Sequence, residues 1–154
     1  MKTRDLLKEV DITAANKMCR DITSLFPDDA NLLFDVGKNL TYATQSSIIK
    51  QNSRVLFSAG LGTMGYSIPA AIGAHYGNHK PSYVITGDGG AQMNIQELNT
   101  IVKNSIPAKI FVLNNRALGN IRIFQENYLN SHFVATGEKE GDYFSCDFVA
   151  IAEA

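Results

Sequence analysis

The chain alternates short apolar runs with stretches whose apolar residues recur every three or four positions. Runs at 31–36, 55–57, 83–85 and 110–113 have the length and apolar character of buried parallel strands. The helical spacing predicts helices at 13–26, 41–50, 66–76, 92–103, 120–129 and 148–154, with Asp147 capping the last. Strand and helix alternate four times. This predicts a three-layer α/β fold, a mostly parallel sheet with helices on both faces.

Two short polar motifs follow the third and fourth of these strands. Gly87-Asp88-Gly89 comes after the first of the pair, and Asn114-Asn115 follows 24 residues later, after the second. The intervening stretch 92–103 is predicted to be a helix, and a right-handed crossover of this kind makes the two strands parallel. Asp88 and Asn115 are therefore expected side by side at the carboxyl edge of the sheet, where open α/β sheets bind ligands.

The residue types at this edge favour a magnesium diphosphate. Mg²⁺ takes one or two protein carboxylate or amide oxygens and keeps phosphate and water for its other positions. Asp88 supplies charge and Asn115 a neutral oxygen, while Gly89 and Gly90 let backbone amides come close to a phosphate. No lysine follows these glycines as in the Walker loop. Either motif alone is explained as a turn or a loop end, but the pair at this spacing predicts the site.

These motifs, together with the segments 60–74, 92–98 and 118–122, resemble the cofactor domain of the thiamine diphosphate enzymes. The resemblance is greatest to the large catalytic subunit of acetolactate synthase, and it is more specific for the cofactor than for the substrate. It implies a thiamine diphosphate-binding domain at 31–154, preceded by a linker and leading helix at 1–30. It also implies that thiamine diphosphate and Mg²⁺ serve decarboxylation or carboligation of a 2-keto acid.

The resemblance assigns roles to individual residues. Asp88, Asn115 and the carbonyl of Ala117 correspond to the magnesium ligands, and the amides after Asp88 to the diphosphate cradle. Gly62, by its carbonyl, and Met64, as an apolar prop, correspond to the loop that meets the aminopyrimidine ring. The implied cofactor-binding residues are Gly37, Asn39, Gly62, Met64, Gly87, Asp88, Gly89, Gly90, Asn115 and Gly119.

Three positions depart from the pattern of the family. Lys38 and Asn39 stand where the family prefers Gln and His, and Tyr42 where Trp is common. These departures leave the contacts at the terminal phosphate open, and they weaken a strict assignment to acetolactate synthase.

No catalytic residue is expected within this chain. In the family, the glutamate that activates the aminopyrimidine belongs to the pyrimidine-binding domain of a neighbouring subunit; Glu97, on the crossover, is better explained as a surface or interface residue. The chain also ends within an amphipathic helix, so we expect an incomplete domain of a larger homo-oligomeric enzyme. Alone, it should bind part of the cofactor without turning over.

Two other functions remain open from the sequence. Residues 60–65 read G-x-G-x-x-G after a strand, and Asp88 lies 23 residues beyond Gly65, which is typical of an NAD-binding Rossmann domain. That alternative leaves Asn114 and Asn115 unexplained. A module that keeps the fold for interaction without catalysis is the second alternative.

Composition excludes some partners. The net charge is −1, which favours neither nucleic acid nor an anionic membrane as a partner, and no apolar run approaches membrane-spanning length. The start of the chain lacks the apolar region of a signal peptide. Cys19 and Cys146 lack metal-site spacing, as do His75, His79 and His132. We therefore expect a cytoplasmic protein with reduced thiols.

Overall fold

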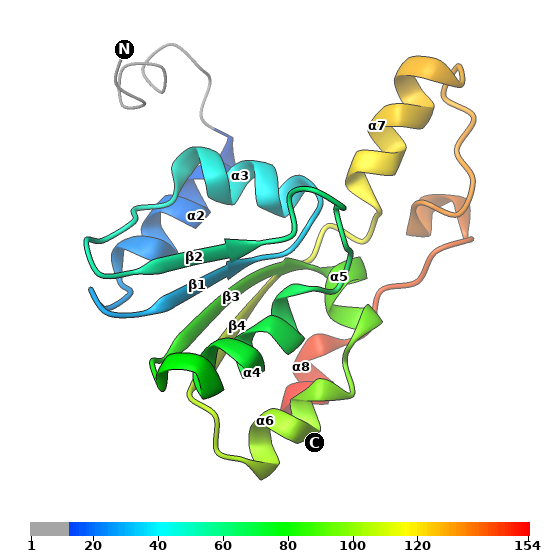
Figure 1. Ribbon diagram of the computed structural model, residues 1–154. Coiled ribbons are helices and arrows are strands. Elements are labelled where there is room, and N and C mark those ends of the chain that lie inside the picture. Colours follow the sequence, from blue (N-terminus) through cyan, green and yellow to red (C-terminus); the bar gives the residue numbers. More distant parts are fainter. Residues whose placement is uncertain (1–12) are drawn as a thin grey trace, which may run out of the picture.

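The computed structural model describes residues 13–154 as a parallel sheet covered by helices on both faces (Figure 1). The first twelve residues of the expected linker lie outside the described part. The strands are β1 (Asn31–Phe34), β2 (Arg54–Phe57), β3 (Ser82–Gly87) and β4 (Ala108–Leu113). The helices are α2 (Ala14–Ser24), α3 (Lys38–Ser46), α4 (Ser67–Asn78), α5 (Asp88–Met93), α6 (Glu97–Lys103), α7 (Gly119–Tyr128) and α8 (Phe148–Glu153), with a 3₁₀ turn, η1, at Glu138–Glu140.

All four described strands are parallel and lie in the order β2-β1-β3-β4. The parallel sheet predicted from the apolar runs is thus confirmed. From β1 the chain crosses to β2 on one side, and it then returns to β3 on the other side of β1. This makes the space between the carboxyl ends of β1 and β3 the topological switch point, the usual ligand position in such sheets.

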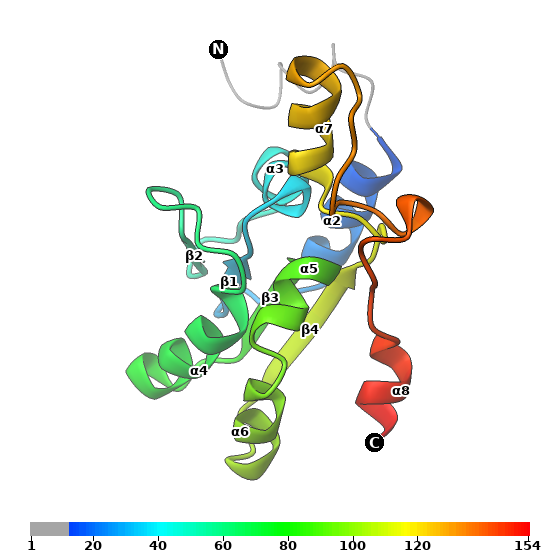
Figure 2. The ribbon, with the colours of Figure 1, turned by 90° about the vertical axis from the view of Figure 1, so that its right-hand side faces the viewer.

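Side chains of the central strands alternate between two apolar cores. Leu32 and Phe34 of β1 face a core with Cys19 of α2 and Ala43 of α3. The intervening Leu33 faces a second core, built on the other side by α4, α5 and α6, where Phe148 of α8 also packs. Figures 1 and 2 show α2 and α3 on one face and α4 and α6 on the other, so the three-layer prediction is confirmed.

The crossover between β3 and β4 differs from the single helix predicted at 92–103. It consists of two short helices, and α5 begins at Asp88 itself, directly at the end of β3. The helix breaks at Asn94, whose φ is −133° and whose side chain donates to the carbonyl of Gly65 at 2.8 Å. The hydrogen bond between Asn94 and Gly65 thus favours a break in the helix at Asn94. The spacing of apolar residues does not reveal such a bond.

The chain beyond β4 forms a helix that projects from the carboxyl edge of the sheet and a strap that returns to it (Figure 2). Here α7 extends from Gly119 to Tyr128, and residues 129–147 lead back to α8. Asp147 caps α8 as predicted, since its carboxylate accepts from the amides of Val149 and Ala150 at 3.1 Å. Within residues 13–154, no helix is both long enough and apolar enough to cross a membrane.

Candidate functional site

The carboxyl ends of three adjacent strands deliver the polar residues of the site. Gly87 of β3 pairs with Leu113 of β4, so Asp88 and Asn114 follow at neighbouring positions of one edge. Beside them, β1 ends at Phe34 and is followed by the buried Asp35. The edge position predicted from the two motifs is therefore the position observed.

A cavity of about 840 Å³ opens at this edge, a volume typical of small-molecule sites. Its walls come from α2, the loop before α4, the start of α5 and the loop between β4 and α7. Every residue that the resemblance implied borders it: Gly37, Asn39, Gly62, Met64, Gly87, Asp88, Gly89, Gly90, Asn115, Ala117 and Gly119.

Three oxygen atoms converge beside the start of α5. With its amide oxygen turned inward, Asn115 places that oxygen 3.0 Å from a carboxylate oxygen of Asp88 and 2.8 Å from the carbonyl oxygen of Ala117. Asp88 is only 1% exposed, so its carboxylate is shielded from water, whereas Asn115 is exposed on the cavity side. Acceptor oxygens so close repel one another unless a proton donor or a cation lies among them.

The donor set fits a magnesium ion. Neighbouring ligands of an octahedral Mg²⁺, with metal–oxygen distances of about 2.1 Å, lie about 3 Å apart, which is the spacing of the inward Asn115 atom from the oxygens of Asp88 and Ala117. One carboxylate, one amide and one carbonyl is also the hard oxygen chemistry that Mg²⁺ selects. Turned over, the Asn115 amide would instead donate from its nitrogen to both neighbours. The Asn115 amide can therefore present its oxygen to a bound ion, or donate from its nitrogen to Asp88 and Ala117 when no ion is bound.

The adjoining Asn114 shapes the loop that carries these ligands. Its side-chain oxygen accepts from the amide of Arg116 at 3.0 Å and from the hydroxyl of Ser145 at 3.2 Å. Arg116 then takes a left-handed conformation, with φ of 54°, and the carbonyl oxygen of Ala117 lies 2.8 Å from the side-chain amide of Asn115. Of the two asparagines, one builds the turn and the other faces the cavity.

The glycines after Asp88 allow close approach. A side chain on Gly89 would lie 2.5 Å from the terminal methyl of Met64 and 2.6 Å from Leu118, and one on Gly90 would lie 2.9 Å from the carboxylate of Asp35. Gly90 is the more restricted of the two, because the buried Asp35 carboxylate is fixed by hydrogen bonds, whereas a side chain on Gly89 would displace the flexible ends of Met64 and Leu118; the backbone of both residues borders the cavity.

Lys38 and Asn39 have different surroundings. Asn39 is buried, and its amide nitrogen donates to the carbonyl of Asp35 at 2.6 Å, so its donor is already used within the protein. Lys38 begins α3 and packs its aliphatic stem over Gly119. Lys38 and Asp88 are the charged side chains among the described residues that line the cavity.

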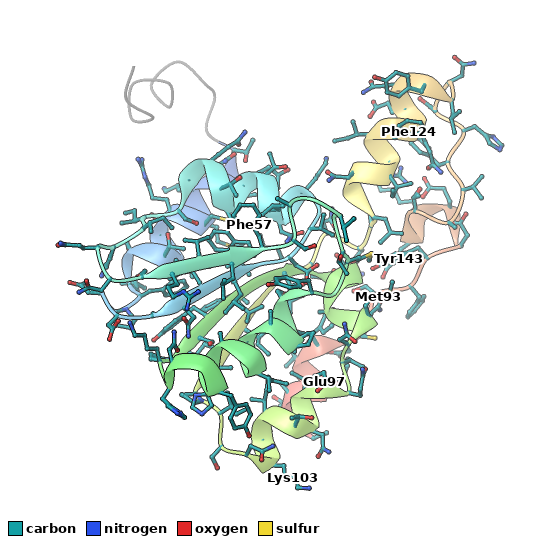
Figure 3. The ribbon with its side chains drawn as sticks, viewed as in Figure 1. Phe57, Met93, Glu97, Lys103, Phe124 and Tyr143 are labelled. Carbon is teal, nitrogen blue, oxygen red and sulfur yellow. The ribbon has the colours of Figure 1, made fainter. Side chains whose placement is uncertain are left out.

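Tyr143 and Asp35 are two site residues that the sequence analysis missed. The hydroxyl of Tyr143 donates to Asp88 at 2.8 Å, from the strap that follows α7; Figure 3 shows Tyr143 beside the start of α5. Burial, and then this hydrogen bond, raise the pKa of Tyr143 well above its ordinary value, so the hydroxyl remains a donor at neutral pH. No local signal marks this contact, since the partners are 55 residues apart.

Other candidate residues stay away from the cavity. Glu97 begins α6 and lies farther along the crossover, toward Lys103 (Figure 3). The histidines also do not line it. In residues 13–154, no three side chains of His, Cys, Asp or Glu lie close enough together to hold a metal ion. Cys19 and Cys146 are free thiols.

The chain is a parallel α/β domain with an oxygen-lined site at the carboxyl edge of its sheet. Glycines stand at the start of the adjoining helix, and no Walker lysine follows them. Together these features are typical of domains that bind a diphosphate through a metal ion. The family described as "Thiamine pyrophosphate enzyme, C-terminal TPP binding domain" matches residues 35–154. The chain belongs to this family, and its fold and cofactor class follow from that membership.

Several curated relatives are acetolactate synthases. The large subunit from Pyropia yezoensis is 35% identical over 154 residues, covering 99% of this chain and 24% of the relative. The isozyme 2 large subunit from Escherichia coli (strain K12) is 32% identical, covering 94% and 26% respectively. The enzyme from Arthrospira platensis is 41% identical over 116 residues, covering 73% of this chain and 20% of the relative. The chain thus spans between a fifth and about a quarter of these relatives.

The geometry also argues against the dinucleotide alternative. The glycines at 60–65 lie in an extended loop between Phe57 of β2 and Ser67 of α4, instead of a tight strand-to-helix turn. Asp88 is the first residue of α5, and its carboxylate lies beside the Asn115 amide. The acid that binds a ribose in a dinucleotide site instead follows the end of a strand and faces the ribose.

Proposed function

We propose that this chain binds thiamine diphosphate through Mg²⁺ and forms the diphosphate half of the active site of an acetolactate synthase-like enzyme. The observation that carries the proposal is the position of the Asn115 side-chain amide, one atom of which lies 3.0 Å from a carboxylate oxygen of Asp88 and 2.8 Å from the carbonyl oxygen of Ala117, about the edge length of a magnesium octahedron. Family membership and the acetolactate synthase relatives support the same cofactor.

The residues of the chain would divide the work of holding the cofactor. Asp88, Asn115 and the carbonyl of Ala117 hold the ion, and the amides that follow Asp88 donate to the diphosphate. Tyr143 fixes the second oxygen of Asp88, which leaves the first oxygen directed at the metal. Gly62 and Met64 face the thiamine end of the cavity.

The substrate class is a 2-keto acid, which the enzyme would decarboxylate and join to a second carbonyl compound. When bound, the cofactor would serve as an electron sink for the bond that breaks as carbon dioxide leaves, and the protein would supply orientation and exclusion of water. The chain itself provides no catalytic acid or base in this proposal. A pyrimidine-binding domain, from the same protein or a partner subunit, supplies the glutamate that activates the cofactor. The domain proper covers residues 31–154, and 1–30 forms a linker and leading helix.

The first test concerns the metal. Asp88→Ala removes the anionic ligand, so we expect Mg²⁺-dependent binding of thiamine diphosphate to fall by about a hundredfold or more, beyond detection by calorimetry. Thiamine diphosphate is titrated into the chain with and without Mg²⁺. The wild-type chain should bind only with Mg²⁺ present.

The matched control is Glu97→Ala, which removes a carboxylate that the structure places outside the cavity. It should bind like the wild-type chain. Unchanged affinity in Asp88→Ala, or wild-type binding that ignores Mg²⁺, would contradict the metal assignment. A parallel titration with NAD should give no heat; binding of NAD without binding of thiamine diphosphate would restore the dinucleotide alternative.

A further inference from the structure

Asp35, a residue to which no role has been assigned, lies beneath the cavity as a fully buried carboxylate. Its exposed fraction is 0%, and no described Lys, Arg or His forms an ion pair with it. A buried carboxylate without a cation is costly unless hydrogen bonds replace its lost water. The hydrogen bonds that Asp35 accepts therefore show which segments of the chain the buried carboxylate holds together.

Four donors surround the carboxylate. One oxygen accepts from the amides of Val36 and Gly65 at 3.0 and 2.9 Å. The other accepts from the amide of Ser67 at 2.9 Å and from its hydroxyl at 2.6 Å. The two oxygens of a carboxylate can accept all four bonds, whereas an amide in the same place would turn its NH₂ group toward a backbone donor.

These bonds join the two halves of the proposed cofactor site. Gly65 lies in the loop that carries Gly62 and Met64, and Ser67 begins α4 at the end of that loop; the same carboxylate packs against Gly90 of the turn after Asp88. On its other side, the loop is held through the carbonyl of Gly65 by Asn94. Asp35 is thus the connection between the loop at the thiamine end and the turn at the diphosphate end.

We infer that Asp35 is a positioning residue that sets the distance between the thiamine-facing loop at 62–67 and the diphosphate-binding turn at 88–90. The inference rests on the proposed function, because it assigns the two ends of one ligand to these two segments. We therefore expect Asp35 to increase the ratio of the affinity for thiamine diphosphate to the affinity for inorganic diphosphate. Inorganic diphosphate needs only the magnesium ligands and the turn.

The test compares two probes on the intact chain: thiamine diphosphate with Mg²⁺, and inorganic diphosphate with Mg²⁺. Asp35→Asn keeps the shape but presents an NH₂ group to two of the four donors. We expect it to reduce the preference for thiamine diphosphate by about fivefold while diphosphate affinity changes by less than about twofold. Asp21→Asn, on the exposed outer side of α2, is the matched control and should leave both affinities unchanged.

Ser67→Ala provides a second, milder variant, since it removes the 2.6 Å hydroxyl bond and leaves the charge in place. It should shift the preference in the same direction by about twofold. Equal losses for both probes, or an unchanged preference in a folded Ser67→Ala or Asp35→Asn chain, would overturn the positioning role. Failure of the wild-type chain to bind thiamine diphosphate with Mg²⁺ would instead count against the proposed function.

Discussion

At the scale of single residues, the charge of the cavity depends on Asp88 and Lys38. A magnesium diphosphate bound beside Asp88 carries a net negative charge, and the walls are otherwise neutral among the described residues. Lys38 occupies the first turn of α3, where the helix dipole disfavours a cation. A bound anion would offset this cost, so we propose Lys38, in place of the hydrogen-bonded Asn39, as a partner for the diphosphate.

We predict that Lys38→Gln weakens binding of thiamine diphosphate with Mg²⁺ by about fivefold, the loss of one partly exposed charged contact. The salt dependence of binding should also become shallower, because one cationic contact is removed. Calorimetry at low and high salt measures both effects. Lys103→Gln, at the far end of α6 in Figure 3, should change neither, and equal effects of the two variants would contradict a specific role for Lys38.

The sequence could reveal site residues that directly follow a strand. Asp88 and Asn115 were predictable because their strands and the crossover between them fix where the motifs end. Asp35 also follows a strand, yet its partners Gly65 and Ser67 lie about thirty residues away. Tyr143 reaches Asp88 from an irregular strap. Contacts of this kind depend on tertiary packing, which periodicity and spacing do not encode.

At the scale of elements, helix existence was predictable and helix boundaries were not. The predicted helix at 41–50 begins instead at Lys38, directly after Gly37, whose φ of 121° turns the chain into α3. The crossover splits into α5 and α6 because Asn94 bonds to Gly65. In both cases a residue at the site moves a boundary, so the largest deviations from the expected pattern lie where the cavity is built.

The leading helix α2 belongs to the main core, and its packing has a consequence for stability. Cys19 is fully buried between α2 and the sheet, and burial raises the pKa of its thiol to about 11, from 9.0. Between these pH values, the unfolded chain loses this proton while the folded chain retains it. Unfolding therefore becomes easier as the pH rises through this range.

We predict that the free energy of unfolding falls between about pH 9 and about pH 11, by up to about 3 kcal/mol through Cys19 alone. Urea unfolding at several pH values measures the decline. Cys19→Ala should reduce its slope, whatever it does to stability at neutral pH. Cys146→Ala is the control because this thiol is only half-buried. The same slope in all three chains would rule out the contribution of Cys19.

At the scale of the whole molecule, the proposed site is half of an active site. The cavity contains the metal ligands and the diphosphate turn, but Asp88 is the only carboxylate among the described residues that line it. Since Asp88 is assigned to the metal, none remains to activate an aminopyrimidine. On the proposed function, this chain would bind the cofactor and a second domain would be needed for turnover.

We accordingly predict that this chain does not decarboxylate pyruvate, even with excess thiamine diphosphate and Mg²⁺. Release of carbon dioxide is measured over hours at high protein concentration. Measurable turnover would contradict the requirement for a second domain. In that event Glu97→Gln would show whether the crossover glutamate supplies the missing group.

The last prediction concerns association, since the sequence predicts a homo-oligomer and α4 carries several apolar residues that could form its interface. In the structure, Ile68 and Ala71 of that helix are buried in the core, whereas large exposed apolar side chains lie along α7. Phe124 and Tyr128 are 54% and 72% exposed, on the helix that projects from the edge of the sheet in Figures 1 and 3. Contiguous exposed apolar surface of this kind usually marks an interface.

We therefore expect dimers or larger species at concentrations of tens of micromolar, measured by light scattering with size-exclusion chromatography. Phe124→Glu places a charge in the centre of the α7 surface and should shift the chain toward monomers by about tenfold in dissociation constant. Val102→Glu is the matched control, because Val102 is 77% exposed but lies on α6, away from α7. A monomeric wild-type chain would contradict the interface, and equal effects of the two variants would show that association does not depend on α7.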